Sequence, residues 1–171
     1  IKDPLTSLRS NGCNLVIKDY SSEYPKVEDI KSFIITYQNR MKKNFDMIII
    51  DYADLVAPSH QHKQERFGIK EVYTGLRRLA NEFKIPVITA SQANRQSMGK
   101  AVITMADFAE DFQKAAIADV VLAICQTPEE LEEDLARIYI AKNRSTGKHL
   151  LFRVQFKSKV MFIGEGHAKE E

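Results

Sequence analysis

The sequence contains no tryptophan and only two cysteines, Cys13 and Cys125, among its 171 residues. Two cysteines cannot build the disulfide framework of a small secreted domain, and no secretory signal pattern is present. No apolar run approaches the roughly 20 residues that a membrane-spanning helix requires. These absences favour a soluble, cytoplasmic protein, and 171 residues suffice for one sizeable hydrophobic core. We interpret Cys125, at the end of an apolar segment, as a small buried residue.

The sequence also lacks the phosphate loop G-x-x-x-x-G-K-[ST]. In that loop, backbone N–H groups surround the phosphates of a nucleotide and the lysine reaches the terminal phosphates. Residues 97–101 resemble the end of the motif, but its first glycine would fall at Asn94, and Ala101 has no hydroxyl to bind magnesium. These residues also follow the wrong strand for such a loop. We interpret them as part of a basic loop.

The most informative feature that is present is a short apolar segment that ends on a carboxylate. Residues 47–50 are apolar without a polar break, and Asp51 follows them. A strand that is apolar on both faces is typical of a parallel sheet covered by helices. Ligands bind at the carboxyl ends of such strands, where an aspartate can hold Mg²⁺ through water beside nucleotide phosphates. Asp51 is therefore our candidate magnesium ligand. The alternative is a surface aspartate that merely ends a buried strand.

A helix and a second short strand follow this segment. Apolar residues recur at the i, i+3, i+4, i+7 spacing of an amphipathic helix through residues 68–83. The second strand, residues 87–90, ends in a polar cluster at residues 91–95. A strand–helix–strand unit with polar groups at both strand ends predicts an α/β fold with a ligand site along one edge of a parallel sheet.

The remaining segments alternate between helical and extended patterns, and we expect residues 1–171 to form a single domain with loosely ordered ends at 1–13 and 164–171. In chain order, we predict a strand at 14–19, a helix at 26–43, polar loops at 58–66 and 91–104, a helix at 107–116, a strand at 119–125, an acidic turn or short helix at 128–134, and antiparallel strands at 137–141, 150–156 and 160–163 with a hairpin turn at 145–148.

Six motifs in this sequence together resemble the DnaB family of replicative DNA helicases, and its bacteriophage branch most closely. The motifs are DYADL at 51–55, YTGLRRLA at 73–80, TASQANR at 89–95, ADFAEDF at 106–112, ADVV at 118–121 and IAKNR at 140–144. Each motif is weak alone, but together they follow the order and the spacing of the family across residues 14–163.

The resemblance implies a RecA-like ATPase core with a mostly parallel sheet flanked by helices and an antiparallel C-terminal β tail. It implies ATP and Mg²⁺ as cofactors, single-stranded DNA as a partner, and a homo-oligomer that is a hexameric ring in the complete protein. A primase and a helicase loader are further partners that it suggests, and a phage-encoded member would act in the host cytoplasm. Because the phosphate loop is absent and the family's catalytic glutamate lies upstream, we expect an incomplete core that is inactive alone.

The resemblance gives Gln92 the role of a sensor that relays the state of the nucleotide to the loop that follows. Gln92 ends the strand beside the one that carries Asp51, so its amide could reach a γ-phosphate or the attacking water. The alternative is a glutamine that only satisfies the ends of neighbouring loops.

Lys142 and Arg144 lie two positions apart at the end of a predicted strand. Alternation places both side chains on one side of an extended segment, where two cations repel each other unless an anion neutralises them. The resemblance supplies that anion as the nucleotide of a neighbouring subunit, with Arg144 as an arginine finger and Lys142 as its support. The alternative is a solvated basic edge.

The net charge of +2 is too small to identify a nucleic-acid-binding protein by itself. Any contact with DNA must therefore come from local basic loops, and the two polar loops are the candidates. In the resembled family these loops line the channel of the ring. Lys63 and Arg66 in the first loop, and Arg95 and Lys100 in the second, could neutralise phosphates. Neither loop has a central aromatic residue, which favours contact with the DNA backbone. The alternative is that both loops are simply solvated.

His60 and His62 have an i, i+2 spacing without a cysteine or a carboxylate cluster nearby in the sequence, a poor pattern for zinc. We interpret the four histidines of the chain as unrelated surface residues. Two other functions remain open. One is a RecA/KaiC-like ATPase that forms rings or filaments without unwinding DNA, and the other is a noncatalytic module for oligomerisation and DNA binding.

Overall fold

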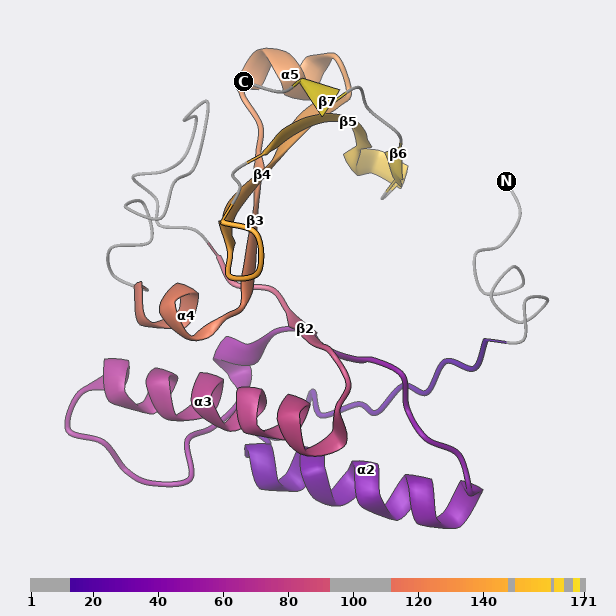
Figure 1. Ribbon diagram of the computed structural model, residues 1–171, viewed down its shortest axis with the longest axis vertical. Coiled ribbons are helices and arrows are strands. Elements are labelled where there is room, and N and C mark those ends of the chain that lie inside the picture. Colours follow the sequence, from indigo (N-terminus) through magenta and orange to yellow (C-terminus); the bar gives the residue numbers. More distant parts are fainter. Residues whose placement is uncertain (1–12, 93–111, 148–149, 161, 165–167, 170–171) are drawn as a thin grey trace.

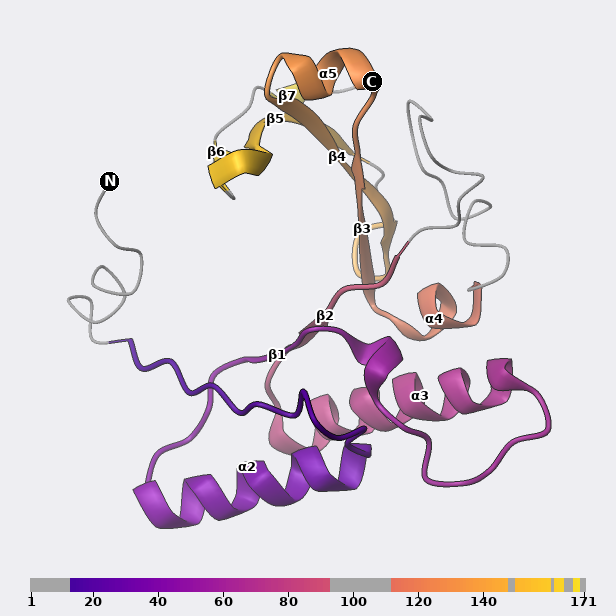
Figure 2. The same cartoon turned by 180° about the vertical axis from the view of Figure 1, so that it is seen from behind.

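The computed structural model describes residues 13–92, 112–147, 150–160, 162–164 and 168–169, and all structural statements concern these residues. The fold is of the α/β class, as predicted. Helices α2 and α3 lie side by side beneath a short parallel sheet, and an antiparallel sheet rises from its far side (Figures 1 and 2). No described helix is both long enough and apolar enough to cross a membrane.

Helix α2 spans Val27–Met41 and matches the prediction to within two residues at each end. The backbone N–H of Lys26 donates to the Asp29 carboxylate at 2.9 Å, which satisfies a donor at the helix start. The helix ends where Lys42 adopts a left-handed conformation with φ 53°. On its inner face, Ile30 and Ile34 are buried.

Helix α3 spans Glu65–Phe83 and begins three residues before the predicted start. Glu65 and Arg66 occupy the positions at which the apolar periodicity would continue before Ile69, so the periodicity could not reveal this turn. Arg66 is therefore in the first turn of a helix, and its assignment to a loop was wrong. Gly75 allows α3 to approach α2 closely, because a Cβ atom there would lie 3.1 Å from Val27 Cγ2.

One hydrophobic core joins the two helices to the parallel sheet. Its buried members are Ile30, Ile34, Ala53, Val56, Val72, Leu76 and Leu79. Ala53 belongs to the 3₁₀ turn η1, Ala53–Leu55, which directly follows the first strand of the sheet. The core therefore fixes the position of that turn.

Strands β1, Ile48–Ile50, and β2, Val87–Thr89, pair in parallel. The middle residue of each strand points away from the helices and is exposed, 68% for Ile49 and 48% for Ile88. Among the described residues, α2 and α3 cover one face of this two-stranded sheet. Periodicity reports that a face is apolar but does not report which element covers it.

The antiparallel sheet contains the predicted C-terminal tail, and its strands are β3 (Val120–Cys125), β4 (Leu135–Asn143), β5 (Leu151–Lys157), β6 (Phe162–Gly164) and β7 (Ala168–Lys169). The order is β3-β4-β5-β6, and β7 also pairs with β5. Cys125 is buried at 1% exposure, as predicted. Gly147, with φ +64°, lies in the predicted hairpin turn between β4 and β5.

Short helices complete the described chain, α4 at Phe112–Ile117, α5 at Pro128–Glu132, and the 3₁₀ turn η4 at Ser158–Val160. Helix α5 confirms the predicted acidic element, whereas the start of the helix predicted at 107–116 lies outside the described residues. Residues 14–19 do not form the predicted strand, and Leu15 and Ile17 are exposed. A strand needs a paired neighbour, which a short apolar run in the sequence does not supply. Ala168–Lys169, expected to be loosely ordered, pairs with β5 instead.

Candidate nucleotide site at the strand ends

The parallel register of β1 and β2 brings two predicted site residues to the same edge of the sheet. Ile50, the last residue of β1, pairs with Thr89, the last residue of β2. Asp51 follows β1 and Gln92 lies three residues beyond Thr89, so both residues come after strand ends at the same edge. Both Asp51 and Gln92 are exposed. Within the described part of the chain, Asp51 has no hydrogen-bond partner that would occupy its carboxylate. This arrangement matches the expected positions of the two residues.

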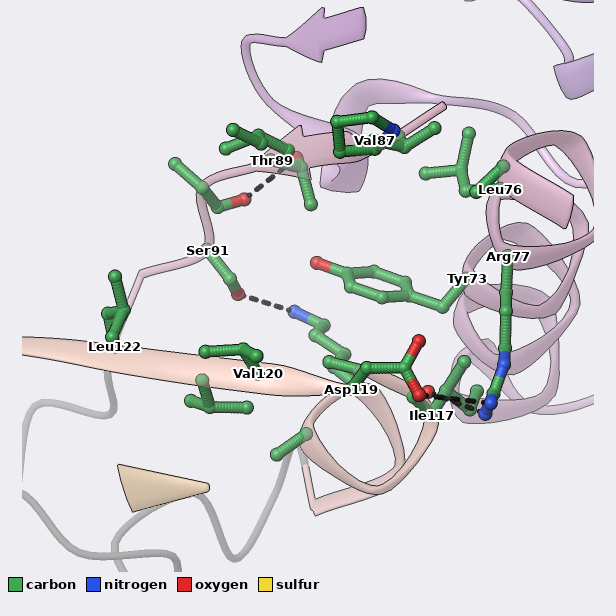
Figure 3. A pocket seen from close by; sticks show the side chains of 18 of the residues that line it. Tyr73, Leu76, Arg77, Val87, Thr89, Ser91, Ile117, Asp119, Val120 and Leu122 are labelled. Atoms are coloured by element: carbon green, nitrogen blue, oxygen red, sulfur yellow. Dashed lines mark hydrogen bonds and ion pairs between the residues drawn. The ribbon is translucent and has the colours of Figure 1, made fainter. Parts of the chain in front are cut away.

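A cavity of about 800 Å³ lies between β2 and β3 (Figure 3). Strand β2 pairs with β1 and strand β3 pairs with β4, so each strand faces the cavity with its other edge. The side chains that line it are mainly apolar, and they include Leu76, Val87, Ile117, Val120 and Leu122. The two sheets are therefore separated by an apolar space, and no described strand pairs with the edges of β2 and β3 that face it.

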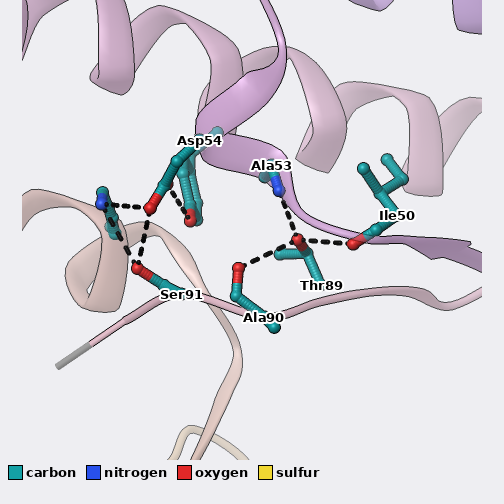
Figure 4. A network of polar contacts seen from close by, with 8 residues as sticks. Ile50, Ala53, Asp54, Thr89, Ala90 and Ser91 are labelled. Atoms are coloured by element: carbon teal, nitrogen blue, oxygen red, sulfur yellow. Dashed lines mark hydrogen bonds and ion pairs between the residues drawn. The ribbon is translucent and has the colours of Figure 1, made fainter. Parts of the chain in front are cut away.

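Thr89 ties the carboxyl ends of β1 and β2 together (Figure 4). Its hydroxyl accepts a hydrogen bond from the backbone N–H of Ala53 at 2.8 Å. It lies 2.9 Å from the Ile50 carbonyl oxygen, to which it donates. The turn after Asp51 is thus fixed to the neighbouring strand. A threonine at a strand end is the only sign of this contact in the sequence.

Asp54 is the centre of a second polar network at the same edge (Figure 4). The Tyr73 hydroxyl donates to Oδ1 at 3.0 Å, and Ser91 Oγ lies 3.3 Å from Oδ2. Lys114 Nζ of α4 donates to Oδ2 at 2.9 Å. Lys114 was not among the predicted site residues, because it lies 60 positions from Asp54 and resembles an ordinary surface lysine in the sequence.

Lys142 and Arg144 both have partners within the chain. Lys142 Nζ donates to the carbonyl oxygens of Ala115 and Ala116 in α4, at 2.9 and 2.8 Å. Burial, and then the positive charge of Arg144, lower the pKa of Lys142 from its ordinary value. Arg144 Nη1 lies 2.8 Å from Asp119 Oδ1. The two cations therefore do not depend on an external anion, although Arg144 keeps 45% of its side chain exposed.

Asp119 is shared between Arg144 and a second arginine. Arg77 Nη2 lies 3.0 Å from the same Oδ1 atom, and Arg77 Nη1 donates to the Ile117 carbonyl oxygen at 3.0 Å. Arg77 thereby connects α3 to the start of β3. This role of Arg77 was not predicted, because Asp119 lies 42 positions away in the sequence.

The predicted DNA-contact residues are only partly described. Lys63 is exposed in the loop before α3. Arg66 lies over the Phe67 ring, 5.0 Å from its centroid. Arg95 and Lys100 lie outside the described residues. Contact with DNA by these four residues therefore stays a prediction.

His60 and His62 share one carboxylate, so their interpretation as unrelated surface residues was wrong. His62 Nε2 pairs with Glu71 Oε2, and His60 Nδ1 lies 3.1 Å from Glu71 Oε1. The backbone N–H of Ser59 also donates to Glu71 Oε1, at 3.0 Å. The contact with His62, then those with His60 and Ser59, lower the pKa of Glu71 to about 2, against the opposing effect of burial. The loop is thereby fixed to α3.

These contacts predict an acid-dependent loss of stability. Because folding lowers the pKa of Glu71, its contribution is complete above its ordinary pKa of 4.5 and is lost as pH falls towards about 2. Wild-type protein should melt at a higher temperature than Glu71→Gln at pH 6, and the difference should shrink between pH 4.5 and pH 3. Glu65→Gln, on the same helix, is the matched control. A difference that stays constant with pH would contradict this assignment.

Comparison with known proteins identifies the family. The DnaB-like helicase C-terminal domain matches residues 6–164. The chain belongs to this family. It is 28% identical over 149 residues to a probable plasmid replicative DNA helicase of Chlamydia psittaci, covering 84% of the chain and 32% of that protein. It is 26% identical over 140 residues to the DnaB-like replicative helicase of Enterobacteria phage T4, covering 79% and 29% respectively.

Solved structures confirm the fold. One, described as the structure of a DnaB-like replicative helicase and its interactions with primase, has a TM-score of 0.75 at 20% identity and covers 94% of this chain and 39% of that chain. Another, described as an ATPase domain, has a TM-score of 0.71 at 23% identity and covers 82% and 51%. The chain thus has the RecA-like fold expected from its motifs, and it spans about a third of the length of the curated relatives that it matches.

Proposed function

We propose that this chain is the C-terminal portion of the ATPase domain of a ring-forming replicative DNA helicase. The complete protein couples ATP hydrolysis to translocation on single-stranded DNA. The observation that carries the proposal is the common edge at which Asp51 and Gln92 emerge from paired parallel strands, in a chain of the DnaB-like family. At that edge Asp51 holds Mg²⁺ through water, and Gln92 contacts the γ-phosphate or the attacking water.

Asp51 fits a magnesium site in its donor chemistry. It offers an exposed carboxylate at the end of a parallel strand, and Mg²⁺ binds oxygen ligands and retains water. No group of three or more His, Cys, Asp or Glu side chains in the described ranges is arranged to hold a metal ion directly. The nucleotide phosphates and water therefore supply the other ligands. When bound, the ion neutralises charge that develops on the phosphates.

The cavity between β2 and β3 supports the proposal that another segment of the full-length protein supplies the strand with the phosphate loop. Its lining is mainly apolar, and within the described ranges no strand pairs with the facing edges of β2 and β3. A strand inserted there would pair on both sides and remove the lining residues from water. We assign this position to the strand that carries the phosphate loop, which places that loop beside Asp51 and Gln92.

The proposed partners are single-stranded DNA and further copies of the same protein. Lys63 and Arg66, with Arg95 and Lys100 in the second loop, contact the DNA backbone. Arg144, supported by Lys142, reaches the nucleotide of the adjacent subunit in a hexameric ring. A primase is a proposed partner because a structural neighbour is described with primase. A helicase loader is proposed from the family resemblance alone.

The proposal predicts a sharp difference between the full-length protein and residues 1–171 alone. Full-length protein should hydrolyse ATP faster with single-stranded DNA and should separate the strands of a forked duplex. The 171-residue chain, without a phosphate loop, should show no hydrolysis above background and no micromolar ATP affinity by calorimetry. ATP hydrolysis by the full-length protein without strand separation would favour the RecA/KaiC-like alternative. Absence of any hydrolysis would favour a noncatalytic module.

A further inference from the structure

One carboxylate, that of Asp54, connects segments that are distant in the sequence (Figure 4). Its Oδ2 atom accepts from Lys114 Nζ at 2.9 Å and from Ser91 Oγ at 3.3 Å, and its Oδ1 atom accepts from the Tyr73 hydroxyl at 3.0 Å. Lys114 Nζ also lies 3.2 Å from Ser91 Oγ. The turn η1, helix α3, the end of β2 and helix α4 therefore meet at this carboxylate.

Burial makes the pair of Asp54 and Lys114 consequential. Lys114 is only 7% exposed, and the Asp54 side chain is 24% exposed. An ammonium group withdrawn from water is tolerated only when it is paired and hydrogen-bonded, so Lys114 is held by its partners more firmly than an exposed lysine would be. The Tyr73 ring, with its centroid 6.0 Å from Lys114 Nζ, adds a further favourable contact.

The network lies next to the proposed chemistry but does not take part in it. Asp54 is three residues beyond Asp51, and Ser91 immediately precedes Gln92. The chain leaves the network at Ser91 and returns to it at Lys114, 23 positions later. The pair thus connects the sheet edge at Asp51 and Gln92, which we call the nucleotide edge, to helix α4. The family resemblance did not include these contacts.

We propose that Asp54 and Lys114 form a positioning pair that couples DNA binding to ATP hydrolysis. Lys114 holds Ser91, and with it the neighbouring Gln92, against the turn that follows Asp51. Lys114 Nζ and Ser91 Oγ both contact Oδ2 of Asp54. A displacement of α4 is therefore transmitted through Lys114 and Asp54 to the strand ends that carry Asp51 and Gln92. Neither residue contacts the nucleotide. This inference rests on the proposed helicase function.

The test is Lys114→Met in the full-length protein, with Lys43→Met as a matched control at an exposed lysine before β1. The rates of ATP hydrolysis with and without single-stranded DNA are measured together with the DNA concentration that gives half-maximal stimulation. In Lys114→Met the DNA-free rate should stay within about twofold of wild type, whereas stimulation by DNA should fall about tenfold, a typical size for coupling between two sites. Lys114→Arg, which keeps the charge, should recover part of the stimulation, and Lys43→Met should behave as wild type.

A purely structural role predicts a different result. If Lys114→Met melts as wild type does and keeps full stimulation, or if its DNA-free and DNA-stimulated rates fall by the same factor, the coupling role is wrong. Should Lys114→Met fail to fold, the double variant Asp54→Leu with Lys114→Met replaces both members of the pair, of which Lys114 is buried, by apolar groups and decides the question by the same rates. A wild-type protein that DNA does not stimulate would contradict the proposed function itself, whereas stimulated wild type with fully stimulated variants would overturn only this inference.

Discussion

Asp51→Asn in the full-length protein is expected to abolish ATP turnover while the fold stays intact. Asp51 emerges at the carboxyl end of β1 with an exposed carboxylate, and it is placed to hold Mg²⁺ through water. Asparagine keeps the size of the side chain but removes the negative charge that attracts the ion. Loss of the metal removes several kcal/mol of charge stabilisation, so steady-state hydrolysis should fall on the order of 10²-fold or more.

Asp46→Asn is the matched control for this experiment. Asp46 is exposed and lies shortly before the other end of β1, so its replacement removes the same charge at a distance from the nucleotide edge. It should leave turnover close to that of wild type, and both variants should melt as wild type does. Unchanged hydrolysis by Asp51→Asn in the presence of DNA and Mg²⁺ would return Asp51 to the alternative of a surface aspartate.

Local patterns predicted the elements that the chain builds from neighbouring residues. The i, i+3, i+4 spacing located α2 and most of α3, and alternation with a glycine turn located the β4–β5 hairpin. The same reasoning placed Asp51 and Gln92 at one edge of the sheet, because strand–helix–strand units are parallel. These features follow from the pattern within each element and from the way in which consecutive elements connect.

Contacts between distant segments could not be predicted in this way. Lys114 lies 60 positions from Asp54, and Arg77 lies 42 positions from Asp119. The predicted strand at residues 14–19 shows the converse error, since the short apolar run at 15–17 is present but forms no strand. Sequence patterns report the preferences of a segment, whereas side-chain partners are set by the packing of whole elements.

Loss of Arg144 should reduce hydrolysis far more than nucleotide binding, if this residue acts on the nucleotide of the adjacent subunit. An arginine finger stabilises charge that develops in the transition state, so Arg144→Ala should lower kcat by about 10³-fold or more. Within the chain, Arg144 pairs with Asp119 through a partly exposed contact, 45% and 59% for the two side chains. An exposed ion pair contributes about 0–1 kcal/mol, so the loss of this pair alone cannot account for such an effect.

Asp119→Asn separates the contribution of that pair from the proposed action across the interface. It removes the partner of Arg144 and of Arg77 but keeps the arginine charge. Turnover by Asp119→Asn should therefore remain much closer to wild type than turnover by Arg144→Ala. An equal loss in both variants would indicate that Arg144 acts through the ion pair.

Mixed rings give the decisive measurement. Full-length Arg144→Ala subunits are combined with full-length Asp51→Asn subunits, each inactive alone. If a site needs Asp51 from one subunit and Arg144 from its neighbour, about one junction in four is intact after random assembly at equal amounts, so ATPase activity returns. If both residues serve the nucleotide of the same subunit, every site carries one defect and no activity is recovered. Mixed assembly is verified with differently tagged subunits. If verified mixed rings recover no activity, the arginine-finger assignment is wrong. Arg144 then belongs to a solvated basic edge, where it pairs with Asp119 of its own chain.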